Sequence, residues 1–309
     1  MLRVSLLALG LALSPHTAGA IDFSGTITIL EGTALVYRGT GCVHAASGLR
    51  LTRGDIIETA PATFAQIELI DRSVLQMGSA TRVLITAPAL RQKPERGLYV
   101  LDGWVKMDGS KREAAAGPGF EIRTPLVDLP AEAAVVVMRQ SASDVALFAE
   151  RGAVHPGERQ ASGANVPVPL KGGDFYARKP GARSAVTVGA SKAFVNDMPR
   201  EFRDLLPPML EKFGDRVVQA VDAPDFAYAD VERWLKAEPS VRRSLMPRWR
   251  RKAREPAFRS ALIANLSAHP EWDPILFPEK YLPKKPPSAN ASLAAGRPVS
   301  SSAAASAAN

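Results

Sequence analysis

Cysteine and histidine are scarce in this chain of 309 residues, which contains one cysteine and four histidines. A lone Cys42 cannot form a disulfide within the chain. His44 lies two residues further on, and this spacing admits a metal or nucleophile site, but His155 and His269 are distant in the sequence. Because apolar and polar residues alternate from Tyr37 to His44, we interpret Cys42 as a small buried strand residue. We expect neither a metal nor a cofactor.

Long hydrophobic runs are absent after the first twenty residues. Residues 1–20 have the parts of a secretory signal peptide: Arg3, an apolar run from Val4 to Leu13, and Ala18-Gly19-Ala20 as a small-x-small cleavage site. The apolar run is shorter than the about 20 residues that span a bilayer. We therefore predict cleavage before Ile21 and export to an extracytoplasmic space, with an uncleaved anchor as the alternative.

Enzyme motifs are also absent: the sequence has no G-x-S-x-G elbow, no H-E-x-x-H, no P-loop and no G-x-G-x-x-G followed by a helix. Carboxylates such as Asp71, Asp102 and Asp108 stand in predicted turns, where aspartate bonds to the backbone. We predict that the protein is not an enzyme. A hydrolase acting on polysaccharide is the alternative, because a pair of catalytic carboxylates on distant strands leaves no sequence trace.

Strand alternation is what the sequence does contain, most regularly from Gly48 to Ile85. Two turn signals interrupt it, Gly54-Asp55 and the segment from Ile70 to Ser73. A three-residue loop at 71–73 collects apolar residues on one face and polar residues on the other, with the pairs Leu69 and Leu75, Ile67 and Met77, Glu68 and Gln76. A two-residue turn would mix the faces, so we predict the three-residue loop.

These residues resemble the FecR domain, an all-β periplasmic module named for the ferric-citrate regulator of Gram-negative bacteria. The resemblance spans residues 30 to 155 and rests on Arg38-Gly39, the L-x-x-G-D of Leu51 to Asp55, Thr59, the alternation from Ala65 to Leu69, Asp71-x-Ser73 with Leu75, and Phe120-x-Ile122-x-Thr124-Pro125. It implies a periplasmic protein for contact or signal relay, in which Gly54, Asp55, Asp71 and Ser73 set turns. Founding members also have a cytoplasmic segment that acts on a sigma factor and a membrane helix. We find neither here, and so expect no direct contact with a cytoplasmic sigma factor.

Two departures from the family pattern concern turns. The family has Asp-Gly-Ser where this chain has Asp71-Arg72-Ser73. Without a glycine, we expect Arg72 to keep a right-handed conformation. The second departure is Pro130-Ala131-Glu132-Ala133, where the family tends to have a Gly-Thr step.

The β pattern continues to about residue 190, with further strands predicted at 120–124, 133–138 and 145–148. From Gly97 to Gly109, a two-residue turn at Asp102-Gly103 would pair Val100 with Val105; a continuous strand bent at Gly103 also fits. The fold class is therefore mainly β, an antiparallel sandwich or a β-helix-like wrap over 21–190, followed by a small all-α domain.

Helical periodicity begins after residue 190. Pro199 to Phe213 predicts one amphipathic helix, or two bent at Pro207-Pro208, and further helices are predicted near Tyr228, Val241 and Pro256. We assign 191–282 to a helical domain. Residues 283–309 are rich in proline, alanine and serine, and we expect them to be disordered.

Charge is concentrated in the third predicted helix and the residues that follow it. From Arg242 to Arg259 eight basic residues stand against Glu255 alone. This segment predicts contact with an acidic envelope protein, anionic lipid or polysaccharide phosphates, and no nucleic acid in this compartment. The residues proposed for contact are Arg248, Arg250, Arg251 and Arg254. A solvated helix face is the alternative.

Aromatic side chains offer a second function. Tyr37, Tyr99 and Trp104 are candidates to stack on sugar rings from an exposed sheet face, which predicts a polysaccharide-binding protein of the cell envelope. The alternative is that Trp104 covers a neighbouring sheet or the helical domain. The first hypothesis remains a non-enzymatic FecR-type interaction or signal-relay module.

Overall fold

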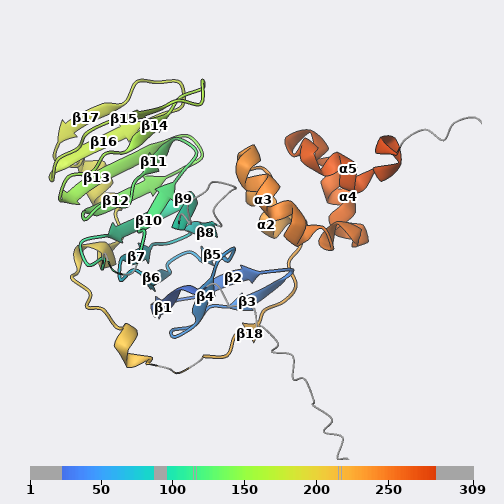
Figure 1. Cartoon of the computed structure of the whole chain (residues 1–309), viewed down its shortest axis with the longest axis horizontal. Coiled ribbons are helices and arrows are strands. Elements are labelled where there is room, and N and C mark those ends of the chain that lie inside the picture. Colours follow the sequence, from blue (N-terminus) through green and yellow to red (C-terminus); the bar gives the residue numbers. More distant parts are fainter. Residues whose placement is uncertain are drawn as a thin grey trace, which may run out of the picture.

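One strand of 13 residues, β9 (Arg96–Asp108), belongs to both sheets of the molecule (Figure 1). The computed structural model describes residues 23–86 and 96–282, apart from 114, 116, 215 and 217. The predicted signal peptide and tail lie outside these residues. Within the described part of the chain, no helix is long and apolar enough to cross a membrane.

Sheet A contains the second half of β9. Its strands, in spatial order, are β4 (Arg50–Thr52), β1 (Phe23–Glu31), β6 (Phe64–Leu69), β7 (Val74–Met77), β9, β12 (Val135–Gln140), β13 (Val145–Arg151), β16 (Asp174–Arg178) and β17 (Ala185–Val188). All these neighbours are antiparallel.

Sheet B contains the first half of β9. Its order is β18 (Val221–Asp222), β3 (Gly41–His44), β2 (Ala34–Arg38), β5 (Ile56–Thr59), β8 (Arg82–Thr86), β9, β10 (Phe120–Arg123), β11 (Val127–Leu129), β14 (Gly157–Arg159) and β15 (Asn165–Pro167). Only the pairing of β9 with β10 is parallel among the described strand pairs.

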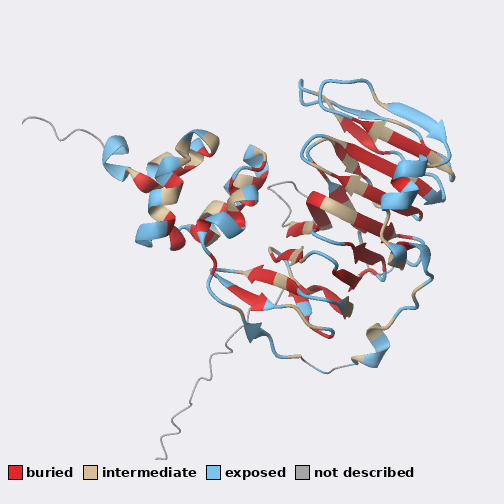
Figure 2. Ribbon diagram, turned by 180° about the vertical axis from the view of Figure 1, so that it is seen from behind, coloured by how far each residue is buried: buried red, intermediate tan, exposed pale blue. Residues whose placement is uncertain are grey.

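The core lies between the two sheets, as the period of two requires. In β6 every residue is buried. Ala65, Ile67 and Leu69 face this core, and the alternate residues face residues 191–213, which cover the outer face of sheet A. Figure 2 shows the buried strands in red along the middle of the sandwich. The predicted mainly β fold with C-terminal helices is confirmed, and the two packed sheets make it a sandwich.

Gly103 is where β9 bends from one sheet to the other. Its φ is +103°, and a Cβ there would lie 2.4 Å from the Cα of Thr81. Only glycine fits this position. The predicted hairpin at Asp102-Gly103 is wrong, and the alternative of a continuous bent strand is correct.

The loop between β6 and β7 differs from the predicted one in position and backbone. Ile67 pairs with Leu75, and the Leu69 N–H donates to the Ser73 carbonyl, so the three loop residues are 70–72. The predicted pairing was displaced by two residues, which keeps the same side chains facing the core. Arg72 has a φ of +69°, so the expected right-handed conformation is wrong. A three-residue loop of this kind ends in a left-handed residue, and Arg72 takes that place without a glycine.

Residues 191–213, which we call the strap, cross the outer face of sheet A. They contain α1 (Lys192–Asp197) and two short 3₁₀ turns, η2 (Arg200–Arg203) and η3 (Leu210–Lys212). The predicted amphipathic helix is absent, because the sheet binds the main chain of the strap. Glu68 accepts hydrogen bonds from the N–H groups of Met209 and Leu210, and Lys106 donates to the Phe202 carbonyl.

The helices after the strap pack against the outer face of sheet B. They are α2 (Tyr228–Leu235), α3 (Pro239–Trp249), α4 (Pro256–Ala264) and α5 (Asp273–Leu276), with 3₁₀ turns η4 (Lys252–Arg254), η5 (Leu266–Ala268), η6 (Pro270–Trp272) and η7 (Pro278–Tyr281). Three tryptophans, Trp234, Trp249 and Trp272, are fully buried there. The helices predicted near Tyr228, Val241 and Pro256 are α2, α3 and α4.

Candidate functional site

The turn between β4 and β5 is built around Gly54 and Asp55. Gly54 has a φ of +90°, and Asp55 is almost completely buried. The Asp55 carboxylate accepts hydrogen bonds from the Thr52 N–H at 2.8 Å and from Arg38 Nη2 at 2.6 Å. This hydrogen bond raises the pKa of Arg38. The pair holds the turn rigid and presents the Gly54 carbonyl outward.

Arg248 binds to this same turn from α3. Its guanidinium donates to the carbonyl oxygens of Gly54 and Tyr37, the latter at 3.0 Å. Burial lowers the pKa of Arg248, and the charge of Asp55 opposes that shift. The structure thus brings the predicted Gly54-Asp55 turn together with Arg248, which the sequence proposed as a contact residue. Arg248 fastens the helices to sheet B and is used inside the molecule.

A second contact joins α2 to the same face of the sheet. The Trp234 Nε1–H donates to Glu58 at 2.6 Å, while Arg82 lies 3.4 Å from Glu58 and 3.0 Å from Asp102. Arg233 adds an ion pair to Asp102. Burial raises the pKa of Glu58, and the Trp234 hydrogen bond and Arg82 oppose this. Because Glu58 and Asp102 are both engaged by basic or N–H partners, we interpret this cluster as a contact that holds α2 on sheet B.

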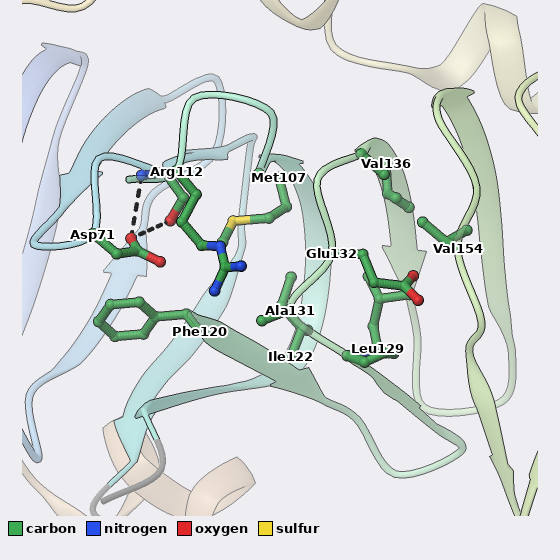
Figure 3. Close-up of a pocket in the computed structure, with 14 residues that line it drawn as sticks. Asp71, Met107, Arg112, Phe120, Ile122, Leu129, Ala131, Glu132, Val136 and Val154 are labelled. Atoms are coloured by element: carbon green, nitrogen blue, oxygen red, sulfur yellow. Dashed lines mark hydrogen bonds between the residues drawn. The ribbon is translucent and has the colours of Figure 1, made fainter. Parts of the chain in front are cut away.

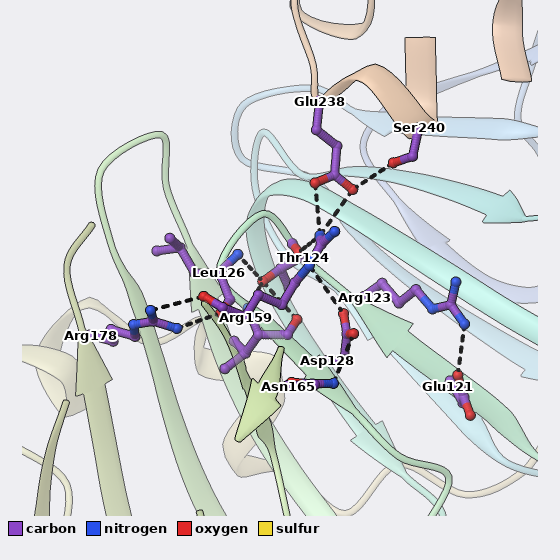
Figure 4. Close-up of polar contacts among 11 residues, drawn as sticks. Glu121, Arg123, Thr124, Leu126, Asp128, Arg159, Asn165, Arg178, Glu238 and Ser240 are labelled. Carbon is purple, nitrogen blue, oxygen red and sulfur yellow. Dashed lines mark hydrogen bonds and ion pairs between the residues drawn. The ribbon is translucent and has the colours of Figure 1, made fainter. Parts of the chain in front are cut away.

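A third contact reaches the strands of sheet B near β14. Figure 4 shows Arg159 between Glu238, which precedes α3, and the Thr124 carbonyl. Arg159 Nη1 lies 2.8 Å from each of Glu238 Oε2 and the Thr124 oxygen. Arg178 donates to the main-chain carbonyl of Arg159 at 3.0 Å. Sequence reasoning missed this cluster, because Arg159 and Glu238 are separated by 79 residues and carry no local motif.

Half of the basic residues between Arg242 and Arg259 are used in such internal contacts. The paired residues are Arg242 with Glu271, Arg248 with Gly54, Lys252 with Asp225 and Glu255, and Arg259 with the Leu276 carbonyl. Burial lowers the pKa of Lys252, but the hydrogen bonds that its ammonium group donates to Asp225 and Glu255 raise it, and the net pKa is raised.

The other half are exposed and have neither an ion pair nor a side-chain hydrogen bond within the described residues. We call them the arginine patch: Arg243, Arg250, Arg251 and Arg254. Arg243 lies in α3, and Arg250, seven residues later, is the residue that caps its C-terminal end in a right-handed helical conformation, so the two lie on the same side of the helix. Arg250, Arg251 and Arg254 lie within five residues of one another. This places several free guanidinium groups at the C-terminal end of α3, next to the docked Arg248.

Asp71 and Ser73 shape the turn between β6 and β7. Figure 3 shows Asp71 beside Met107, Arg112 and Phe120 around a small pocket. Asp71 Oδ1 accepts from the Ser73 N–H at 3.1 Å and from its hydroxyl at 2.6 Å. The cavity of about 20 Å³ has room for about one water molecule. The two residues shape the hairpin, and the pocket beside them is too small for a ligand.

Trp104 and the two tyrosines considered for sugar stacking are packed against other rings. Trp104 is half-buried, with its ring centroid 4.9 Å from that of Phe194 in the strap. Tyr37 and Tyr99 are buried under the helices, beside Phe226 and Trp234. Cys42 is buried in β3, and burial raises the pKa of its thiol to about 11. Within the described residues, no group of histidine, cysteine and carboxylate side chains is arranged to hold a metal ion.

One protein family matches part of the chain. The family model for FecR protein matches residues 55–155, about a third of the chain, which confirms the resemblance found in the sequence. No curated protein matches the chain.

Two crystal structures, at 1.65 Å and 2.50 Å, are similar to part of the chain; both are of a protein from Parabacteroides distasonis ATCC 8503 described as an anti-sigma factor. Identities are 15% and 14%, TM-scores 0.35 and 0.36, and the matches cover 43% and 46% of this chain. They span 59% and 64% of the other protein, less than two thirds of its length.

Proposed function

We propose that this chain is a non-enzymatic interaction module of the bacterial cell envelope, which relays a signal by binding an acidic envelope protein through the arginine patch. The FecR match supports an envelope role. The signal-peptide pattern in residues 1–20 supports export to the periplasm. In this proposal the β domain of residues 21–190 is the scaffold, and the helical domain of residues 191–282 presents the contact surface.

The observation that carries the proposal is the division of the basic residues into two groups. Arg248 holds the helices on sheet B, and Arg242, Lys252 and Arg259 make contacts within the helical region. The arginine patch has neither an ion pair nor a side-chain hydrogen bond within the described residues. Guanidinium groups bind carboxylates in a bidentate manner. Unpaired arginines in and just after a docked helix therefore suit an acidic protein surface, to which they add attraction and orientation.

The test compares two double variants of the mature chain that change net charge equally. Arg250→Glu/Arg251→Glu reverses the patch. Arg200→Glu/Lys212→Glu reverses two exposed cations of the strap that have no ion pair among the described residues. Each variant is cross-linked in cells, and captured envelope proteins are quantified by mass spectrometry. We expect a protein captured by the wild type and the strap variant to be lost from the patch variant.

Equal capture by all three forms, insensitive to salt, would show that the patch is only solvated. Sedimentation with vesicles that contain anionic lipid separates a lipid partner from a protein partner. If the patch variant loses vesicle binding while protein capture is unchanged, the surface meets the membrane and the proposed protein contact is wrong.

A further inference from the structure

We propose that β17 is a second, independent docking site, at which an acidic extended segment of another protein adds a strand to sheet A. This inference goes beyond the proposed function, because it uses a different surface from the arginine patch. It rests on a free strand edge, a neighbouring groove and the charges around both.

The strand edge is the first observation. β17 ends sheet A, and in the described part of the chain it pairs with β16 alone. All four of its residues are exposed, and Val188 is 92% exposed. Figure 2 shows this end of the sandwich in pale blue. Natural proteins usually protect such edges with charges or proline inside the strand. The sequence of β17, Ala-Val-Thr-Val, contains neither.

The hydrogen-bonding pattern shows which main-chain groups are free. The Gly189 N–H donates to the Gly173 carbonyl at 2.8 Å. Alternation in an antiparallel pair then directs the main chain of Thr187 toward β16. The N–H and C=O groups of Val186 and Val188 consequently point away from the sheet. They offer an added strand two donors and two acceptors.

The second observation is a groove beside this edge on the outer face of sheet A. Its volume is about 370 Å³. Apolar residues from β13, β16, β17 and α1 line it, including Ala146, Phe175, Ala185 and Phe194. A side chain on the outer face of an added strand is within reach of this groove. Strand addition takes affinity from main-chain bonds and specificity from such side-chain pockets. The groove therefore suits one large apolar residue in the incoming segment.

Charge decides what kind of segment fits. Four exposed cations surround the edge and the groove, and none has an ion pair within the described residues: Lys171, Lys179, Arg183 and Lys192. Three acidic residues nearby are already engaged: Asp144 and Asp197 lie beside Arg139, and Asp174 of β16 accepts a hydrogen bond from the Lys171 N–H. An acidic strand is attracted to this edge. A second copy of the chain would bring its own cations, so like charges oppose pairing between two β17 strands.

The other edge at this end is closed to strand addition. β15 ends sheet B and contains Pro167, which has no N–H to donate. β17 is thus the edge at this end of the sandwich that can accept a strand.

The experiment uses the full mature chain and a synthetic probe. The probe is a fluorescent ten-residue peptide of alternating valine and glutamate with one central phenylalanine; its counterpart has lysine in place of glutamate. Val186→Pro/Val188→Pro removes both outward N–H groups but none that bonds to β16. Val186→Thr/Val188→Thr is the matched control, since threonine keeps the donors and the strand preference.

We expect the acidic peptide to bind the wild type, to bind the proline variant at least about tenfold more weakly, and to bind the threonine variant within about twofold. The lysine peptide should not bind. Arg250→Glu/Arg251→Glu should leave binding unchanged, which separates this site from the proposed function. Absence of saturable binding, equal binding to the proline variant, or loss of binding in the arginine variant each overturns the proposal.

Two further measurements cover the remaining outcomes. Analytical ultracentrifugation that shows a wild-type dimer and a monomeric proline variant would make a second copy the occupant, and would overturn the acidic partner. If circular dichroism shows that the proline variant does not fold, hydrogen exchange of the wild type tests strand addition instead. Slower exchange at the Val186 and Val188 amides with the peptide bound supports strand addition, and unchanged exchange refutes it.

Discussion

Arg248 donates a hydrogen bond to the carbonyl oxygen of Gly54, a residue 194 positions earlier in the chain. This contact joins the helices to the turn that Asp55 and Arg38 stabilise. We expect Arg248→Ala to lower the free energy of unfolding of the helical part by about 1.5 to 3 kcal/mol, because two partly buried carbonyls lose a charged donor. Urea unfolding followed by tryptophan fluorescence measures this, since Trp234, Trp249 and Trp272 all lie in that part.

Arg250→Ala is the control for Arg248→Ala. Its side chain is exposed and unpaired among the described residues, so the change in unfolding free energy should stay within about 0.5 kcal/mol. Equal effects of the two substitutions would mean that Arg248 does not fasten the helices.

Arg72 occupies a backbone conformation that glycine adopts at lower cost. Its φ of +69° costs a side-chain-bearing residue about 1 kcal/mol or more, whereas glycine is not penalised there. We expect Arg72→Gly to raise the midpoint of urea unfolding, by up to about 1 kcal/mol in free energy. Arg72→Ala is the control: it also removes the exposed ion pair with Glu113 but keeps the strain, so it should not stabilise the protein.

Gly103 tolerates no side chain at the bend of β9. Gly103→Ala would place a Cβ 2.4 Å from the Thr81 Cα, and its φ is positive. We expect a loss of about 3 kcal/mol or more, or failure to fold. Gly181→Ala has a positive φ but nothing within 4 Å, and should cost about 1 to 2 kcal/mol. The unfolding temperatures of the two variants separate the effect of steric overlap with Thr81 from that of backbone strain alone. Equal decreases in unfolding temperature would show that the overlap contributes nothing.

His269 makes stability depend on pH. It is completely buried, with its Nε2 3.1 Å from the Tyr228 hydroxyl, and burial lowers its pKa. Above the unfolded-state pKa of about 6.5, His269 is neutral in both states and its full contribution is present. Below it, the unfolded chain binds the proton first, so stability falls as pH drops from about 6.5. We expect the wild type to lose more stability than His269→Gln between pH 7.5 and 5.5.

The control for His269 is Tyr228→Phe, which removes the hydrogen bond but leaves the imidazole buried. This variant should be less stable than the wild type at both pH values, but it should lose the same amount of stability between pH 7.5 and 5.5. If His269→Gln and the wild type change in parallel, other groups cause the pH dependence.

Local patterns predicted the strands and three of the helices. The alternation around Ile67 and the stripe containing Trp234 depend on neighbouring residues, so they are visible in the sequence. The FecR resemblance came from turns such as Gly54-Asp55, whose residue types the local backbone selects. The failures occurred where a distant element competed with local preference. The segment from Pro199 to Phe213 has helical spacing, but Glu68 and Lys106 bind its main chain and hold it largely extended.

The composition and periodicity of the chain were enough to establish a β region followed by helices, because burial alternates with a period set by each kind of backbone. They also showed a basic third helix. Which of its arginines are free followed only from the folded chain. Arg248 and Arg250 are both basic residues of the same segment, yet one meets Gly54 and Tyr37 while the other stays exposed. The partners of Arg248 lie about 200 residues away along the chain, and only tertiary packing brings them within hydrogen-bonding distance.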